Sequence, residues 1–164
     1  MLKPVIAALD VNTEAEALRI ADLLGGRIDV YKVGPVLFYK YGRKIIDELN
    51  RRGKKVFLDV KLYDIPNTVK IAVETLQEID IYAVTVHLSG GEEMLKKVAS
   101  LKRRPLIWGV SVLTSFDDSA LKTLGFSCGA ADQVDRLVKI GLKNNVDGIV
   151  SVSYTHLRAH ETVL

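Results

Sequence analysis

Short, continuously apolar runs alternate with amphipathic segments along the chain. Six runs lack the polar alternation of a half-exposed strand, so we expect buried parallel strands within residues 5–9, 28–33, 55–59, 82–86, 105–112 and 147–152. Apolar residues at helical spacing predict helices after Thr13, across 41–49, after Pro66, and over 92–101, 119–124 and 130–142. Strands that alternate with helices in this way predict an α/β fold with a parallel sheet.

Polar residues gather where the predicted strands end. They are Asp10, Lys32, Asp59, Lys61, His87, Thr114 and Ser115. In α/β folds the carboxyl ends of parallel strands are where binding and catalytic sites are built. A doubly wound sheet and a (β/α)8 TIM barrel both fit, but polar residues at four or more strand ends favour the barrel. Only about six βα units of such a barrel are present in this chain.

The composition limits the class of protein. The 164 residues suffice for one domain, with 48% hydrophobic and 26% charged residues. The net charge of +3 is spread along the chain and does not indicate a nucleic-acid partner. A single cysteine, Cys128, rules out an internal disulfide and fits a cytoplasmic location. No apolar run approaches the roughly 18 residues of a membrane span, so no membrane partner is expected.

Residues 153–164 do not continue the pattern, because they follow the sixth strand without a turn or a helix signal. His156 and His160 are four residues apart, a spacing that a metal site could use. The interpretation that we favour is that the segment resembles a translated sequencing adapter. We therefore expect a partial barrel domain over 1–152 and a non-native tail over 153–164.

The densest charge cluster combines Lys32, Asp59, Lys61 and Asp64. Asp59 and Lys61 are two residues apart, so on a strand both point to the same face. Carboxylates beside Lys61 keep it cationic, which opposes imine chemistry but allows the ammonium to stabilise a carbanion and then protonate it. No cluster of Cys, His and Asp has metal-ligand spacing, so no metal is expected. The alternative is a salt-bridged strand end that only stabilises the fold.

The segment Asp59-x-Lys61-x-x-Asp64-Ile65-Pro66-Asn67-Thr68 resembles the signature of orotidine 5'-phosphate decarboxylase. Further matches, in order along the chain, are Ala8-Leu9-Asp10, Tyr31-Lys32-Val33-Gly34, Val86-His87, Gly90-Gly91 and Leu113-Thr114-Ser115. The resemblance extends from residue 4 to about residue 152. Sugar-phosphate decarboxylases and aldolases of the same suprafamily share the Asp-Lys-Asp core but not the Ile-Pro-Asn-Thr continuation.

The resemblance implies a homodimeric TIM-barrel enzyme without cofactor or metal that converts orotidine 5'-phosphate (OMP) to UMP and CO2 in de novo pyrimidine synthesis. It implies that Lys61 protonates C6 and stabilises the carbanion there, and that Asp59 lies near the departing carboxylate. The remaining roles are ribose contacts by Lys32 and Asp10, contacts across the dimer interface by Asp64 and Thr68, and contact with the pyrimidine edge by Thr114 or, less favoured, Ser115. We expect His87 to pack or hydrogen-bond rather than to act as an acid or base.

The family continues through two more βα units, which supply a Gln and an Arg that bind the substrate phosphate. We therefore expect the 164-residue polypeptide, made as written, to fold poorly and to have little or no activity. Two alternatives remain open. One is a sugar-phosphate decarboxylase or aldolase of the same suprafamily, usually magnesium-dependent, and the other is a non-catalytic fragment that retains a barrel-like binding site.

Overall fold

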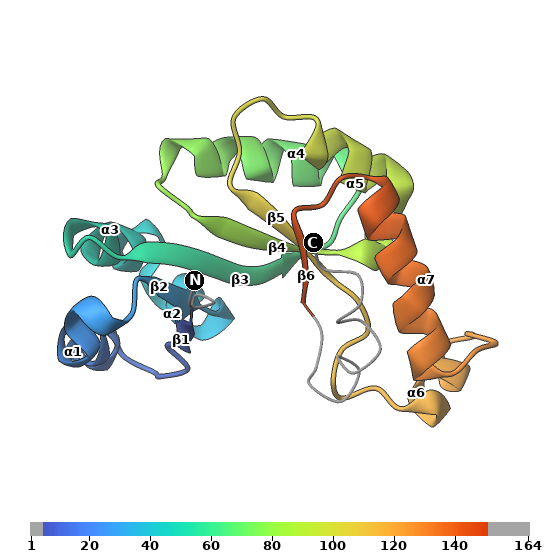
Figure 1. Ribbon diagram of the computed structural model, residues 1–164, viewed down its shortest axis with the longest axis horizontal. Coiled ribbons are helices and arrows are strands. Elements are labelled where there is room, and N and C mark those ends of the chain that lie inside the picture. The colour runs from blue at the N-terminus through green and yellow to red at the C-terminus, as the bar shows by residue number, and fades with distance from the viewer. Residues whose placement is uncertain (1–4, 151–164) are drawn as a thin grey trace.

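The computed structural model of the chain describes residues 5–150, and the expected tail over 153–164 lies outside these residues. Six parallel strands form one sheet in the order β1-β2-β3-β4-β5-β6 (Figure 1). Their bounds are β1 (Ile6–Ala8), β2 (Val30–Val33), β3 (Lys55–Leu62), β4 (Ala83–His87), β5 (Leu106–Val110) and β6 (Gly148–Val150). A doubly wound sheet reverses its strand order at a switch point, whereas a barrel wall is strictly sequential. The predicted fold, six units of a (β/α)8 barrel, is therefore confirmed.

The helices lie around one side of the sheet (Figure 1). They are α1 (Glu14–Leu24), α2 (Pro35–Tyr41), α3 (Arg43–Arg51), α4 (Pro66–Thr75), α5 (Gly91–Ala99), α6 (Asp118–Thr123) and α7 (Ala130–Lys143). The helix expected across 41–49 is in fact two helices. Gly42 separates them with φ of +54°, a left-handed backbone that cannot continue a right-handed helix.

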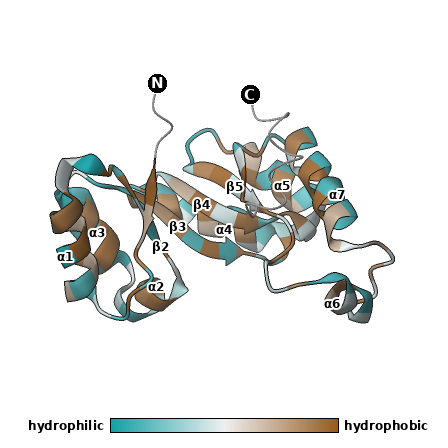
Figure 2. Ribbon diagram, turned by 60° about the horizontal axis from the view of Figure 1, so that its bottom comes forward, coloured by the Kyte–Doolittle hydropathy of each residue, from teal (hydrophilic) through white to brown (hydrophobic). Residues whose placement is uncertain are grey.

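The outward faces of the strands pack against these helices in one large apolar cluster. Tyr31, Leu58 and Val86 belong to it and are almost completely buried. Helices α1, α3, α5 and α7 carry both brown and teal residues, as amphipathic helices do (Figure 2). Helices α1, α2, α3, α4, α5 and α7 contribute residues to this cluster, so it joins the outer face of the sheet to these helices.

A second, smaller apolar cluster lies on the opposite face of the sheet, because its strand residues alternate with those of the large cluster. It contains Val30, Phe57 and Ala83, with Ile6, Tyr82, Leu106, Trp108 and Val150 packed against them. The rings of Phe57 and Trp108 are 4.4 Å apart between centroids. Since side chains alternate along a strand, Asp59 and Lys61 share the face of Phe57. The cluster therefore forms an apolar floor on the inner face of the barrel, below the polar strand ends.

Candidate active site

The centre of the site is an ion pair within β3. The Lys61 ammonium lies 3.0 Å from each oxygen of the Asp59 carboxylate, and Asp59 is buried. The predicted strand ended at residue 59, but β3 continues to Leu62, so both residues are strand residues. The prediction that their side chains share a face is consistent with this pairing. The arrangement holds a lysine cation at the carboxyl end of the strand, in contact with an anion that solvent scarcely reaches.

Backbone pairing between β3 and β4 is irregular at this point. The register passes from Leu58 opposite Val84 to Leu62 opposite Val86, so β3 uses four residues where β4 uses two. Lys61 adopts φ of +50°, which is uncommon for a residue other than glycine. Bulges of this kind redirect side chains and are frequent beside active sites. The bulge is what separates Lys61 from the regular ladder of the sheet.

Thr85 of β4 connects both residues of the pair. Its hydroxyl accepts a hydrogen bond from the Lys61 backbone N–H at 2.8 Å and donates one to Asp59 Oδ1 at 3.0 Å. The side chain is completely buried. Sequence reasoning missed Thr85, because a threonine within an apolar strand is also an ordinary β-branched strand former. The sequence did contain one indication of its role: Thr85 lies two residues before His87, at the strand end, and therefore shares a face with it.

Asp10 and Lys32 form a second ion pair on neighbouring strands. Lys32 Nζ lies 3.2 Å from the Asp10 carboxylate. Ala8 of β1 stands opposite Lys32 of β2 in the parallel register, which brings Asp10, two residues beyond, to the end of the pair of strands. The Asp10 side chain is exposed and Lys32 is partly buried. This pair is therefore open to solvent and to any ligand that enters the barrel mouth.

Asp64 and Thr68 lie beyond the end of β3, on the loop and on the first turn of α4. Both are exposed, and both line a hollow of about 270 Å³ together with Lys61, Tyr39 and Tyr63. The Asp64 carboxylate accepts a hydrogen bond from the Ile65 N–H at 2.6 Å. Within the described part of the chain, no ion pair joins Asp64 to Lys61. The structure thus brings Asp64 to the same hollow as Lys61 without including it in the central pair.

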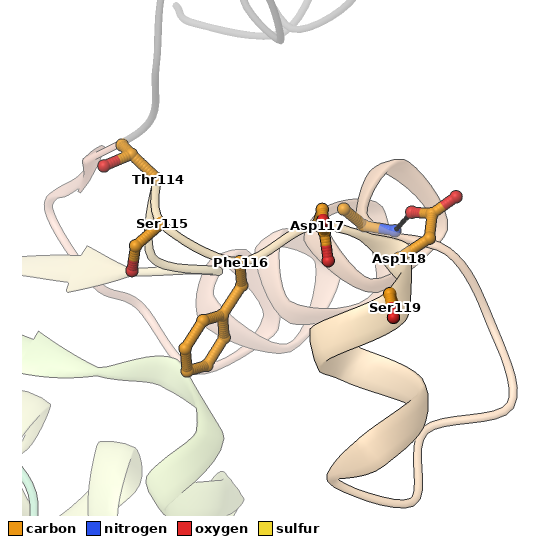
Figure 3. Close-up of a pocket in the computed structure, with 7 residues that line it drawn as sticks. Thr114, Ser115, Phe116, Asp117, Asp118 and Ser119 are labelled. Carbon is orange, nitrogen blue, oxygen red and sulfur yellow. Dashed lines mark hydrogen bonds between the residues drawn. The ribbon is translucent and has the colours of Figure 1, made fainter.

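Thr114 and Ser115 lie on the loop after β5, in a different hollow of about 470 Å³. Figure 3 shows them on the same loop as Phe116, with Asp117 and Asp118 at its far end. Asp118 Oδ1 accepts a hydrogen bond from the Ala130 N–H at 2.7 Å, which ties this end of the loop to the start of α7. Thr114 is exposed and does not line the hollow of Lys61.

His87 ends β4 beside the site. Its ring lies 5.4 Å from the ring of Tyr63, between centroids. Burial lowers the pKa of His87 below its usual value, and the positive charge of Lys61 lowers it further. A neutral imidazole packed against an aromatic ring fits the expected packing role.

Residues 5–150 contain no group of three or more His, Cys, Asp or Glu side chains placed to hold a metal ion. No helix in this part of the chain is long and apolar enough to cross a membrane.

Comparison with known proteins places these residues in a family context. The orotidine 5'-phosphate decarboxylase from Carboxydothermus hydrogenoformans is 40% identical over 159 residues, which cover 92% of this chain and 66% of that protein. The one from Laribacter hongkongensis is 42% identical over 153 residues, covering 91% of this chain and 63% of that protein. The chain thus spans less than two thirds of the length of these curated relatives.

Solved structures of similar fold include a member of the same group of enzymes. The orotidine 5'-phosphate decarboxylase from Lactobacillus acidophilus has a TM-score of 0.88 at 33% identity, over 97% of this chain and 75% of that one. An uncharacterized conserved protein from Geobacillus kaustophilus has a TM-score of 0.89 at 32% identity, over 96% of this chain and 78% of that one. The family model described as orotidine 5'-phosphate decarboxylase / HUMPS family matches residues 3–162. The chain belongs to the orotidine 5'-phosphate decarboxylase / HUMPS family.

Proposed function

We propose that the chain carries the catalytic core of an enzyme that decarboxylates orotidine 5'-phosphate to UMP and CO2. The observation that carries the proposal is the Lys61 ammonium, 3.0 Å from both oxygens of the buried Asp59 carboxylate at a strand end. Decarboxylation of a pyrimidine leaves an electron pair on C6, and a fixed cation beside that carbon stabilises the charge as it develops. The family and its curated relatives support the same reaction.

The step requires no group beyond the lysine and the substrate. The bond from C6 to the carboxylate breaks, CO2 leaves, and the electron pair remains on C6. Lys61 Nζ then transfers a proton to C6, and the amine regains a proton from solvent. Asp59 orients the ammonium through both of its carboxylate oxygens, and we place this carboxylate near the departing carboxylate of the substrate. We propose that the reaction uses neither a cofactor nor a metal ion.

The second ion pair suits the sugar of the substrate. Lys32 and Asp10 offer a donor and an acceptor at the end of the adjacent strands, and the Asp10 carboxylate faces solvent. A ribose has hydroxyl groups that can both donate to a carboxylate and accept from an ammonium. We assign the ribose contacts to these two residues. The family resemblance supports the proposal that Thr114, on the loop after β5 and outside the hollow of Lys61, contacts the pyrimidine edge.

A second copy of the chain is the proposed partner. Asp64 and Thr68 are exposed at the rim of the Lys61 hollow, where they can extend into a neighbouring subunit. Two exposed aromatic residues, Tyr39 and Tyr63, line the same hollow, and the exposed Ile65 directly follows Asp64. Each of the three is more than half exposed. Exposed aromatic and apolar groups beside polar ones are typical of protein interfaces. A cytoplasmic location is part of the same proposal.

The test measures OMP consumption by an extended chain. This is residues 1–150 followed by the part of the Carboxydothermus hydrogenoformans relative that lies beyond the matched region. We expect turnover that persists in EDTA and falls at least about 100-fold in Lys61→Ala. Lys55→Ala, at the opposite end of β3, is the matched control and should keep the parent rate. We expect the 164-residue chain, assayed beside it, to show little or no activity.

Other results would redirect the assignment. Turnover that EDTA abolishes, or activity on a sugar phosphate instead of OMP, indicates the sugar-phosphate branch of the suprafamily. UMP binding with no turnover in the parent indicates a binding domain. Full activity in Lys61→Ala contradicts the proposed mechanism.

A further inference from the structure

Thr85 is the one completely buried side chain that touches both residues of the central ion pair by hydrogen bonds within the described part of the chain. It lies on β4, whereas Lys61 and Asp59 lie on β3. The hydroxyl uses its single proton toward Asp59 Oδ1 and one lone pair toward the Lys61 N–H. The bond directions are thereby fixed, because Asp59 as a carboxylate can only accept and the N–H can only donate.

The bulge explains why a side chain must serve here. Between Leu58 and Leu62 the regular pairing of β3 with β4 is interrupted, so the Lys61 N–H is outside the ladder. A buried N–H without a partner costs free energy, and the Thr85 hydroxyl satisfies it. The same bond holds Lys61 at φ of +50°, a conformation that persists only when surrounding contacts determine it.

We propose that Thr85 is a positioning residue that sets the direction of the Lys61 ammonium. It holds the side chain at both ends: at the root through the Lys61 N–H, and at the tip through the Asp59 carboxylate that the ammonium contacts. Thr85 itself acts through these two residues and not on the reacting carbon. The consequence for turnover rests on the proposed function, whereas the geometric part does not.

Two substitutions at Thr85 and one control elsewhere isolate the effect of the hydroxyl. Thr85→Val keeps the size and the β-branch but removes the hydroxyl, and Thr85→Ser keeps the hydroxyl but removes the methyl group. Thr75→Val is the matched control, because it makes the same change at a threonine on the exposed side of α4, whose hydroxyl donates one hydrogen bond to the Ile71 carbonyl at 2.9 Å. Backbone amide exchange at Lys61, followed by NMR, and turnover of OMP are both measured on the extended chain.

The proposal predicts that Thr85→Val speeds exchange of the Lys61 amide by about tenfold, the factor expected for one lost hydrogen bond. It predicts that kcat falls by about 10- to 100-fold while KM changes much less, because orientation of the reacting group is lost and no substrate contact is removed. Thr85→Ser should restore both values, and Thr75→Val should leave both unchanged. If Thr85→Val does not fold, Thr85→Ser decides: loss of Lys61 amide protection in that variant overturns the proposal.

Two outcomes separate this inference from the proposed function. If the parent extended chain does not consume OMP, the proposed reaction fails, and the exchange rates of the Lys61 amide still decide the role of Thr85. If the parent is active and Thr85→Val keeps both its kcat and the slow exchange of the Lys61 amide, Thr85 has no positioning role.

Discussion

The Lys61–Asp59 pair and the Lys32–Asp10 pair lie at the carboxyl ends of neighbouring strands, and each joins one lysine to one aspartate. The two ammonium groups are similarly part-buried, with 34% of the Lys61 side chain and 25% of the Lys32 side chain exposed. The carboxylates differ: 13% of the Asp59 side chain is exposed, against 68% for Asp10. The buried pair is also fixed by Thr85, within a strand bulge.

On the proposed function, this difference separates two tasks within one site. A group that moves a proton needs a fixed direction before the substrate arrives, because reorganisation during the reaction raises the barrier. A group that binds a flexible polar part of the substrate can exchange water for ligand as the ligand enters. The Lys61–Asp59 pair is already held in one direction, as proton transfer requires. The Lys32–Asp10 pair is exposed to solvent, as binding of a polar ligand group requires.

The largest expected effect compares the two aspartates in the extended chain. Asp59→Asn should lower kcat about 100-fold or more, because the Lys61 ammonium loses the charge that orients it. Asp10→Asn should lower kcat/KM by about tenfold, chiefly through KM, because one hydrogen bond to the substrate weakens. Steady-state kinetics on OMP checks both. Equal losses in kcat would remove the distinction between the pairs.

A smaller effect, on the free energy of unfolding, concerns the backbone conformation of each lysine. Lys61 has positive φ, whereas Lys32 lies in a regular strand. Lys61→Gly should therefore be more stable than Lys61→Ala by about 1 kcal/mol, since glycine adopts left-handed backbone without strain. At position 32 the order reverses, because glycine in an ordinary strand is less stable than alanine by about 1 kcal/mol. Urea unfolding of the four variants measures the two differences, and the same sign at both positions would contradict the strain at Lys61.

The smallest effect uses His87 as a reporter of the buried pair. Lys61→Met should raise the pKa of His87 toward its usual value, although burial keeps it lowered, and Lys32→Met should leave it unchanged. An NMR titration of the His87 ring measures this. No change in Lys61→Met would show that the ammonium lies elsewhere.

The lowered pKa of His87 also links folding to pH. As the pH falls, the unfolded chain takes up this proton first, so the contribution of His87 to stability is complete above the unfolded value of about 6.5 and is lost below it. His87→Gln removes that part of the pH dependence. The unfolding free energy of the parent, measured relative to that of the variant, should therefore fall as the pH is lowered from 8 to 5.

The sequence predicted the central pair because its physics is local. Residues two apart on a strand must share a face, so Asp59 and Lys61 could be placed together before any tertiary contact was known. The barrel was predicted from a different pattern, because polar residues at many strand ends fit a barrel better than a doubly wound sheet. The break at Gly42 was not predicted, since a glycine inside an apolar helical pattern is often tolerated.

Thr85 and the bulge could not be predicted in this way. A bulge depends on the register in which β3 pairs with β4, and the hydrophobic pattern of neither strand indicates that register. The position of Thr114 has a similar origin, since a loop that is tied to α7 through Asp118 is placed by contacts distant in sequence. Local periodicity thus gives which face a residue occupies, and tertiary contacts give what it meets there.

The aromatic floor of the barrel has a practical consequence. Trp108 is the single tryptophan of the chain, and it packs against Phe57, whose strand continues into Asp59 and Lys61. Its fluorescence therefore comes from one place, the inner face of the barrel below the Lys61–Asp59 pair. Any ligand, variant or solvent condition that loosens the inner face should change this emission, so the molecule carries its own optical probe of the site without a label.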